Sequence, residues 1–323
     1  MHTNWSELVE LMSLREWEGL VFVALGSLAL WGAFFVLLGR RVWRLFAGGA
    51  ATTTPHHRRF HLIVYALCAL YAATFAYARY IEPQKLVLKR LVIQSAKLPP
   101  GTTLRIAHVS DLHAQAHRQP QLERAAEAVV DLHPDLVVMT GDYLCDFTHG
   151  APTALLAFLL RLPDVPTYAV PGNYGGRLPA DAFFETLGIE ILHTETRLFS
   201  VRGVPIELHG ASPRRKAMQL KPRLAPERLG IFLQHFPSLL PSAVAAGFDL
   251  YLAGHTHGGQ VRIPGYGAIV TLDRLGKTFE MGAYQVGDTT GFINAGVGME
   301  CRWAPQVRLF CPPEIALIEI RGP

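Results

Sequence analysis

The sequence contains two carboxylates, one amide and four imidazoles that could act together as metal ligands. They are Asp111, His113, Asp142, Asn173, His235, His255 and His257. A donor set of oxygen and nitrogen without thiolates suits Mn²⁺, Fe or Zn²⁺ better than Ca²⁺ or a structural zinc. Seven ligands are too many for one tetrahedral ion. They fit two ions about 3.5–4 Å apart that share a bridging carboxylate and activate water for attack on phosphorus.

Each of these residues follows a short apolar run, which is typical of a buried strand. The expected strands are Leu104–Val109, Leu136–Met139, Tyr168–Val170, Gly230–Leu233 and Leu250–Ala253. Apolar residues at helical spacing predict helices over 122–132 and around 154–162. In α/β sheets the ligand site lies beyond the carboxyl ends of the strands. We therefore expect the separate loops to converge on one cleft.

The motifs that carry these residues resemble, in their order, the calcineurin-like metallophosphoesterase family. They are Asp111-Leu112-His113, Gly141-Asp142, Gly172-Asn173, the isolated His235 and Gly254-His255-Thr256-His257. The resemblance covers about residues 102–321 and includes the run from Gly258 to Pro264 and Pro313-Glu314-Ile315. These additional segments resemble a membrane-associated branch that includes UDP-2,3-diacylglucosamine diphosphatases and related phosphodiesterases.

The resemblance implies an α/β fold, a four-layer αββα sandwich with a two-metal site in its cleft. One ion would be held by Asp111, His113 and His257, and the other by Asn173, His235 and His255. Asp142 would bridge the two ions. The expected catalytic residues are Asp142, Asn173 and His255, and the expected cofactors are two divalent ions, with Mn favoured over Fe or Zn.

One position departs from the family pattern. The family usually has His followed by Asp or Glu after Gly-Asn, whereas this chain has Tyr174 and Gly175. General acid catalysis contributes typically about 10²–10⁴-fold, so Tyr174 indicates either a slow enzyme or a leaving group that needs little protonation. It also leaves open a catalytically weak, metal-binding sensor or scaffold. His117 and His149 are interpreted as exposed loop histidines, not as replacements.

Two uncharged apolar runs precede the catalytic region. They cover about residues 19–38 and 62–78, and they predict two transmembrane helices. The expected domains are therefore a membrane anchor with a linker over 1–101 and a catalytic domain over 102–323. The acidic N-terminus, with Glu7 and Glu10, favours retained anchors over a cleaved signal peptide. Basic residues number five between the spans and six on the other side, and this count leaves the orientation open.

The charge and the cysteine content limit the binding partners and the cellular compartment that we expect. The net charge is only +4 and no long basic block is present, so nucleic acid is not an expected partner. Cys68 lies in an apolar run, and the other three cysteines are an odd number with no readable disulfide framework. That count favours a reducing compartment, hence the cytoplasmic face. A basic cluster is interpreted as a solvated loop, or alternatively as contacting anionic headgroups or the substrate phosphate. Its members are Arg214, Arg215, Lys216, Lys221 and Arg223.

Together these features predict a multi-pass protein of a bacterial-type inner membrane that hydrolyses a phosphodiester or pyrophosphate with metal-activated hydroxide. The favoured substrate is lipid-linked, such as UDP-2,3-diacylglucosamine, by analogy with the family branch. The alternatives are a broad phosphodiesterase or phosphatase for soluble substrates and the sensor or scaffold. No protein partner is predicted.

Overall fold

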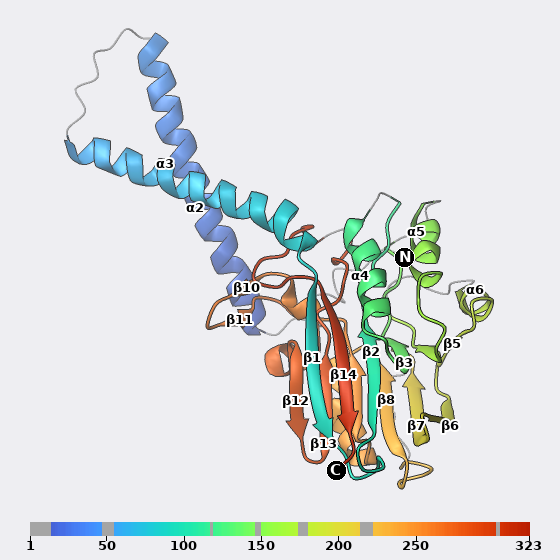
Figure 1. Ribbon diagram of the computed structural model, residues 1–323. Helices are drawn as coiled ribbons and strands as arrows, with labels where there is room; N and C mark the ends of the chain where they lie inside the picture. The colour runs from blue at the N-terminus through green and yellow to red at the C-terminus, as the bar shows by residue number, and fades with distance from the viewer. Residues whose placement is uncertain are drawn as a thin grey trace.

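The computed structural model describes residues 14–46, 55–116, 119–145, 150–173, 180–213, 222–301 and 304–323. It shows two long helices that project from a body of sheets and shorter helices (Figure 1). All five predicted strands are present as β2, β3, β4, β8 and β9. The predicted helices correspond to α4 and α5.

The projecting helices are α2 (Leu14–Phe46) and α3 (Pro55–Ala76), and the latter continues through η1 (Tyr77–Ile81) and η2 (Glu82–Gln84). Their segments Glu16–Trp43 and Pro55–Gln84, with mean hydropathies of 2.4 and 1.6, are long and apolar enough to cross a membrane. Most of their side chains are exposed, and a small cluster around Leu37, Val64 and Cys68 packs the two helices together. The predicted spans lie within these segments.

Two six-stranded sheets form the body. The first has the order β1 (Val87–Gln94), β14 (Glu314–Arg321), β2 (Thr103–Val109), β3 (Leu136–Met139), β4 (Thr167–Ala169) and β5 (Ile189–Ile191). The second has the order β12 (Gly282–Val286), β13 (Thr289–Ile293), β9 (Leu250–Ala253), β8 (Leu229–Gln234), β7 (Val204–Ala211) and β6 (Thr196–Val201). The strands that lead to the candidate site run parallel to one another within each sheet: β2, β3 and β4 in the first, and β8 and β9 in the second.

The two sheets face each other across an apolar core, and helices cover both outer faces. Strand residues such as Ile106, Val138, Ile206 and Ile231 fill the space between the sheets. The outer face of the first sheet packs against α4 (Pro120–Asp131), α5 (Ala151–Leu159) and α6 (Ala180–Glu185). The outer face of the second packs against α7 (Leu240–Ala246). Burying one large aliphatic side chain stabilises the fold by about 1.5–3 kcal/mol, so this double core holds the strand ends firmly. The arrangement is the expected four-layer sandwich.

Short elements complete the body. They are η3 (Pro237–Leu239), η4 (His257–Gly259), the two-stranded hairpin of β10 (Arg262–Ile263) and β11 (Gly267–Ala268), and η5 (Gly276–Phe279). The hairpin lies beside the lower end of α2 (Figure 1).

The body begins earlier in the sequence than the expected boundary at residue 101. Strand β1 pairs in parallel with β14 from Val87 to Gln94, although this segment was assigned to the anchor and linker. The side chains of β1 are all exposed or half-buried, because β1 is the edge strand of the sheet. A strand of this kind lacks the continuous apolar run that made the central strands recognisable. Only the pairing with the distant β14 identifies it as part of the sheet.

Candidate metal centre

All seven predicted ligands lie at one edge of the sandwich, beyond the carboxyl ends of strands from both sheets. Three follow strands of the first sheet: Asp111 after β2, Asp142 after β3 and Asn173 after β4. Three more follow strands of the second sheet: His235 after β8, and His255 and His257 after β9. His113 is two residues beyond Asp111. The convergence expected from the sequence is therefore observed.

Three of the ligands form a tight group. The Nε2 atom of His257 lies 3.5 Å from Oδ1 of Asp111 and 3.0 Å from Nε2 of His113. The Nε2 atom of His113 lies 3.9 Å from the same Asp111 oxygen. All three side chains are buried. Their ligand atoms lie close enough together to hold one metal ion.

Asp142 links this group to the remaining ligands. Its Oδ2 atom lies 3.6 Å from Nε2 of His113 and 3.3 Å from Nε2 of His235. The same His235 nitrogen lies 2.7 Å from Oδ1 of Asn173. The ring of His255 is centred 5.0 Å from that of His235. Asp142 thus lies between the two halves of the site.

Hydrogen bonds to the protein fix which atoms remain to bind a cation. The Nδ1 atom of His235 donates to the carbonyl of Thr140 at 2.7 Å, so its Nε2 faces the site. The Nε2 atom of His255 donates to the carbonyl of Leu272 at 2.8 Å, which leaves Nδ1 as its ligand atom. Donation to a carbonyl is the usual way in which a protein orients a metal-binding imidazole.

Asp111 supplies the clearest sign that a cation fits. Its Oδ2 accepts hydrogen bonds from the Ser110 hydroxyl at 2.6 Å and from the His255 amide at 3.0 Å. Its Oδ1 is buried and has no hydrogen-bond partner among the described residues. An unpaired buried carboxylate oxygen is costly, and a metal ion beside it would remove that cost.

The backbone of the site is strained in the same places. Asp111, His113, Asp142, His255 and His257 all have positive φ angles, from 42° to 70°. This left-handed conformation costs about 1–3 kcal/mol for each residue that is not glycine. It persists only where the surrounding structure enforces it. The strain turns each side chain into the cleft immediately after its strand.

Two motif glycines make room for the carboxylates. A Cβ atom at Gly172 would overlap Oδ1 of Asp142, and one at Gly254 would overlap Oδ2 of Asp111 and the Ser110 hydroxyl. The glycine before Asn173 and the glycine before His255 are therefore required by packing.

Burial sets the charge of three of the imidazoles. It lowers the pKa of His113 to about 4 and that of His255 to about 3, and it lowers the pKa of His257 well below its usual range. These rings are neutral at pH 7. A neutral imidazole offers a lone pair to a metal ion.

His235 and Asp111 behave differently. Burial alone would lower the pKa of His235, but the Asp142 carboxylate beside it raises the pKa to about 9. Burial raises the pKa of Asp111 to about 6. A positive charge is therefore favourable between these carboxylates, and a proton on His235 provides it when no metal ion does.

Several residues that contact the site were not predicted. Oε2 of Glu300 lies 3.9 Å from Nε2 of His257, and the buried Arg308 binds the backbone of the loop that contains Glu300. Cys145 and Cys301 form a disulfide. The interpretation of the cysteines as an unpaired odd number was therefore wrong, because the two partners are 156 residues apart and only the fold brings them together.

The basic cluster also needs a correction at Arg223. Its side chain is buried and pairs with Glu207 at 3.2 Å and Asp249 at 3.0 Å, so it is neither solvated nor available to headgroups. The cluster's other members, Arg214, Arg215, Lys216 and Lys221, lie outside the described residues. Tyr174, Gly175, His117 and His149 also lie outside them.

Comparison with known proteins gives a consistent result. Residues 104–259 match the family described as calcineurin-like phosphoesterase. The uncharacterized metallophosphoesterase YkuE of Bacillus subtilis is 28% identical over 265 residues, which cover 77% of this chain and 90% of that protein. The phosphodiesterase YaeI of Escherichia coli is 28% identical over 277 residues, covering 81% and 98% respectively. An uncharacterized metallophosphoesterase of Aquifex aeolicus is 27% identical over 258 residues, covering 75% and 95%.

Proposed function

We propose that this chain is a calcineurin-like metallophosphoesterase, a membrane-anchored, metal-dependent phosphoester hydrolase that acts on lipids. The bond cleaved is a phosphodiester or pyrophosphate of a lipid-linked substrate. The observation that carries the hydrolytic part is that Asp111 shares two close groups of ligand atoms, one with His113 and His257 and one with Asp142 and His235, while its own Oδ1 is unpaired among the described residues.

We assign two divalent cations to the centre. Asp111, His113 and His257 would hold one ion, Asn173, His235 and His255 would hold the other, and Asp142 would contribute to both. The position of Asp142 between His113 and His235 supports this division. The nitrogen and oxygen donors suit manganese, which we place ahead of iron and zinc.

The residues of this chain supply binding and orientation. Bound divalent ions contribute Lewis acidity, lower the pKa of water and stabilise charge on the phosphoryl oxygens. Asp142 places its carboxylate between the two ligand groups, and Asn173 directs its amide oxygen toward His235. His255, fixed through the Leu272 carbonyl, completes the predicted catalytic set.

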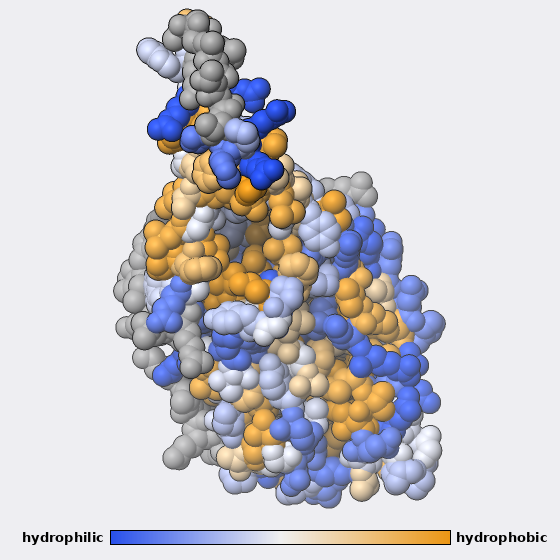
Figure 2. Space-filling view, turned by 90° about the vertical axis from the view of Figure 1, so that its left-hand side faces the viewer, coloured by the Kyte–Doolittle hydropathy of each residue, from blue (hydrophilic) through white to orange (hydrophobic). Residues whose placement is uncertain are grey.

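Support for a lipid substrate comes from an apolar groove between α2 and the β10–β11 hairpin. The groove has a volume of about 540 Å³ and is lined by Phe22 and Val23 of α2 and by Ile263, Tyr266 and Ile269. This volume is in the usual range for ligand sites, about 300–1,000 Å³. Figure 2 shows apolar side chains around the projecting helices that continue onto the adjoining surface of the body. An acyl chain in a bilayer that surrounds α2 could enter this groove sideways.

The groove is connected to the metal centre by a short segment. Ile269 lines the groove, and the carbonyl of Leu272 three residues later accepts the hydrogen bond of His255. Three extended residues span at most about 11 Å. Glu16 of α2 secures this segment by accepting hydrogen bonds from the amide and hydroxyl of Thr271, both at 2.7 Å. A lipid held in the groove would therefore place its headgroup near the ions.

Hydrolysis by the purified full-length protein with Mn²⁺ tests the activity. Three substrates are compared: UDP-2,3-diacylglucosamine, phosphatidylglycerol and a soluble chromogenic phosphodiester. Asp142→Ala is expected to abolish all turnover, because it removes the shared ligand. Turnover that survives in this variant would contradict the metal-centre assignment.

A pair of valines in α2 tests the lipid specificity. Val23→Trp fills the groove and is expected to raise KM for the lipid substrate about tenfold, or about 1.4 kcal/mol in binding, without changing soluble-ester turnover. The matched control is Val21→Trp, because Val21 is exposed on the same helix and does not line the groove. Equal effects of the two variants would refute the groove. Soluble-ester turnover alone would favour a broad phosphodiesterase, as the name of the relative YaeI suggests, and metal binding without turnover would favour a sensor or scaffold.

A further inference from the structure

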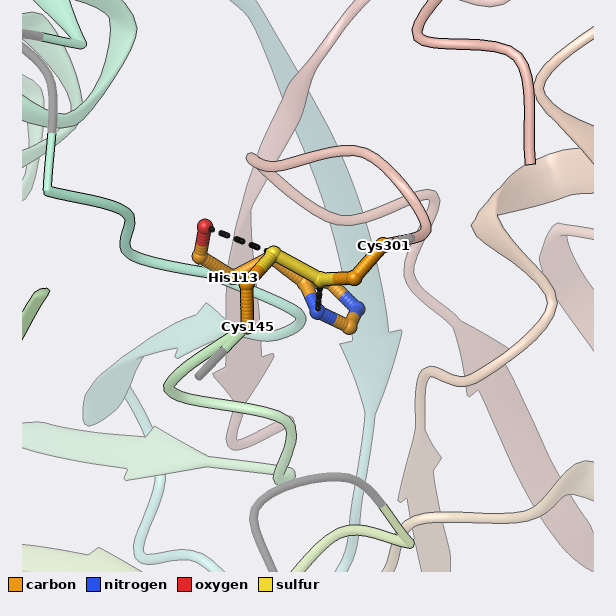
Figure 3. A group of neighbouring side chains, drawn as sticks. All are labelled: His113, Cys145 and Cys301. Carbon is orange, nitrogen blue, oxygen red and sulfur yellow. Dashed lines mark hydrogen bonds between the residues drawn. A yellow bond between two sulfur atoms is a disulfide. The ribbon is translucent and has the colours of Figure 1, made fainter. Parts of the chain in front are cut away.

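The predicted metal ligand His113 is in contact with a disulfide. The hydrolytic function does not by itself require this disulfide. Cys145 lies three residues after Asp142, and Cys301 lies in the loop after β13. Both cysteines are buried, and their Cα atoms are 5.5 Å apart. Figure 3 shows the sulfur bridge lying against the imidazole and the carbonyl of His113. The bridge therefore ties two distant loops together at one metal ligand.

The contact with the ring fixes its tautomer. Sγ of Cys301 lies 2.9 Å from Nδ1 of His113. A disulfide sulfur carries no hydrogen, so only the ring N–H can donate in this pair. The proton is therefore on Nδ1, and Nε2 keeps its lone pair. This is the state that a ligand to a cation needs.

The same contact sets the direction of the Nε2 lone pair. That atom faces Asp142 at 3.6 Å and His257 at 3.0 Å. Carboxylates or backbone carbonyls usually orient a metal-binding imidazole from its far side. Among the described residues, the Cys301 sulfur occupies this place for His113, whereas His235 and His255 use the carbonyls of Thr140 and Leu272.

The segment that contains Asp142 and Cys145 also holds the backbone around His113. The φ angle of His113 is 42°, an uncommon value for a residue other than glycine. The Asp142 carbonyl accepts from the His113 amide at 2.9 Å, and the Cys145 amide donates to the Ala114 carbonyl at 3.1 Å. The disulfide adds a covalent link from this pair of segments to the loop after β13. Without it, only noncovalent contacts would maintain the strained conformation.

We propose that the Cys145–Cys301 disulfide positions His113 for metal binding and so couples the metal affinity of the centre to the thiol redox state. The inference rests on the proposed role of His113 as a ligand. Reduction by a dithiol transfers two electrons and two protons to the bridge. It breaks the S–S bond, gives two thiols and leaves the reductant as a disulfide. The sulfurs then separate, and the contact that fixes the ring is no longer enforced.

The test measures Mn²⁺ affinity calorimetrically in detergent-solubilised full-length protein. Mn²⁺ is chosen because thiolates prefer softer metals, so the reduced cysteines do not compete for it. The variants are Cys145→Ser with Cys301→Ser, and the control is Cys68→Ser, which changes a free cysteine in α3. The double variant is expected to bind Mn²⁺ about 10–100-fold more weakly, the usual effect of removing a residue that orients a ligand. Chemically reduced wild type should match it, and Cys68→Ser should match oxidised wild type.

A second readout separates positioning from general stability. The tautomer of His113, followed by ¹⁵N NMR of its imidazole in metal-free protein, is expected to be a single Nδ1–H form only when the bridge is intact. A folded double variant with unchanged tautomer and Mn²⁺ affinity within about twofold of wild type would overturn the inference, whatever its melting temperature. Oxidised wild type that binds no Mn²⁺ would refute the proposed function itself. Bound Mn²⁺ that is insensitive to the bridge would refute only the inference.

Discussion

At the scale of single residues, the centre combines neutral and charged imidazoles. Burial keeps His113, His255 and His257 neutral, since each has a lowered pKa. His235 differs because the Asp142 carboxylate lies 3.3 Å away and stabilises its charged form. Three of the proposed ligands therefore need no deprotonation at pH 7, and one does. A cation that binds at His235 must replace a proton.

This difference predicts proton release. With the pKa of His235 at about 9, adding Mn²⁺ to chelator-treated protein at pH 7 should release about one proton at the His235 half of the site. Calorimetry in buffers of different ionisation enthalpy measures it. Affinity should rise with pH toward 9, and it should fall steeply below about 6, where Asp111 takes up a proton. His235→Gln should abolish the release, and His209→Gln, on β7, should leave it unchanged. Identical binding heats in all buffers would count against a charged His235.

At the scale of elements, the loop after β13 is hydrogen-bonded to the segment after β2 that contains Asp111. Its Val297 and Gly298 amides donate to the carbonyls of Ser110 and Asp111, at 3.1 and 2.7 Å. The guanidinium of Arg308 is fully buried and donates to the carbonyls of Ala295 and Gly296, at 2.9 and 3.0 Å. It also reaches the carbonyls of Gly298 and Cys311. One arginine therefore shapes the loop that holds Asp111 in place.

Replacing Arg308 with lysine should lower the stability of the fold strongly, although the positive charge is kept. Arg308→Lys keeps the charge but loses the planar fork of donors, and several charge-assisted hydrogen bonds contribute about 1.5–3 kcal/mol each. We expect a loss of at least about 3 kcal/mol in unfolding free energy, measured by thermal or denaturant unfolding in detergent, with weaker Mn²⁺ binding. The matched control is Arg90→Lys, because Arg90 is itself mostly exposed and Glu319 keeps Arg321 as a second partner, so this loss should be only about 1 kcal/mol. Similar stability of the two variants would show that the loop does not depend on Arg308.

At the scale of the whole molecule, two observations bear on which side of a membrane the body would occupy. Disulfides persist in oxidising compartments and are rare in the cytosol, so the bridge argues against the cytoplasmic face that the cysteine count favoured. The charge count changes too, because Arg90 and Lys97 form ion pairs within the folded body, with Glu319 and Asp249. Five basic residues, at the C-terminal end of α2 and the N-terminal end of α3, then exceed the four that remain on the other side of the two helices. By the positive-inside rule, the connection between α2 and α3 would be cytoplasmic and the body outside.

Reporter fusions in a bacterial host test this orientation. Alkaline phosphatase fused after Pro323 should be active, and the same enzyme inserted after Ala50, between the helices, should be inactive. A fluorescent protein that matures only in the cytoplasm should give the opposite pattern. The reverse outcome would place the body inside, where the disulfide would be reduced and UDP-2,3-diacylglucosamine would become the first substrate to examine. With the body outside, a phospholipid of the outer leaflet takes precedence.

The strands and the convergence of the candidate ligands that follow them could be predicted from local sequence. Buried parallel strands are continuous apolar runs, and the residues after them, such as Asp111, Asp142 and His255, must meet at one sheet edge. The two long apolar helices were equally visible, because their signal is a local run of side chains.

Only the tertiary structure decided the features that depend on residues far apart in the chain. The pairing of β1 with β14, the burial of Arg223 and the Cys145–Cys301 bridge join segments that no local pattern relates. The charge of His235 likewise follows from its distance to Asp142 and from burial, not from its neighbours in sequence. Local periodicity reports which face of an element is buried, whereas contacts between elements are fixed only when the two sheets pack.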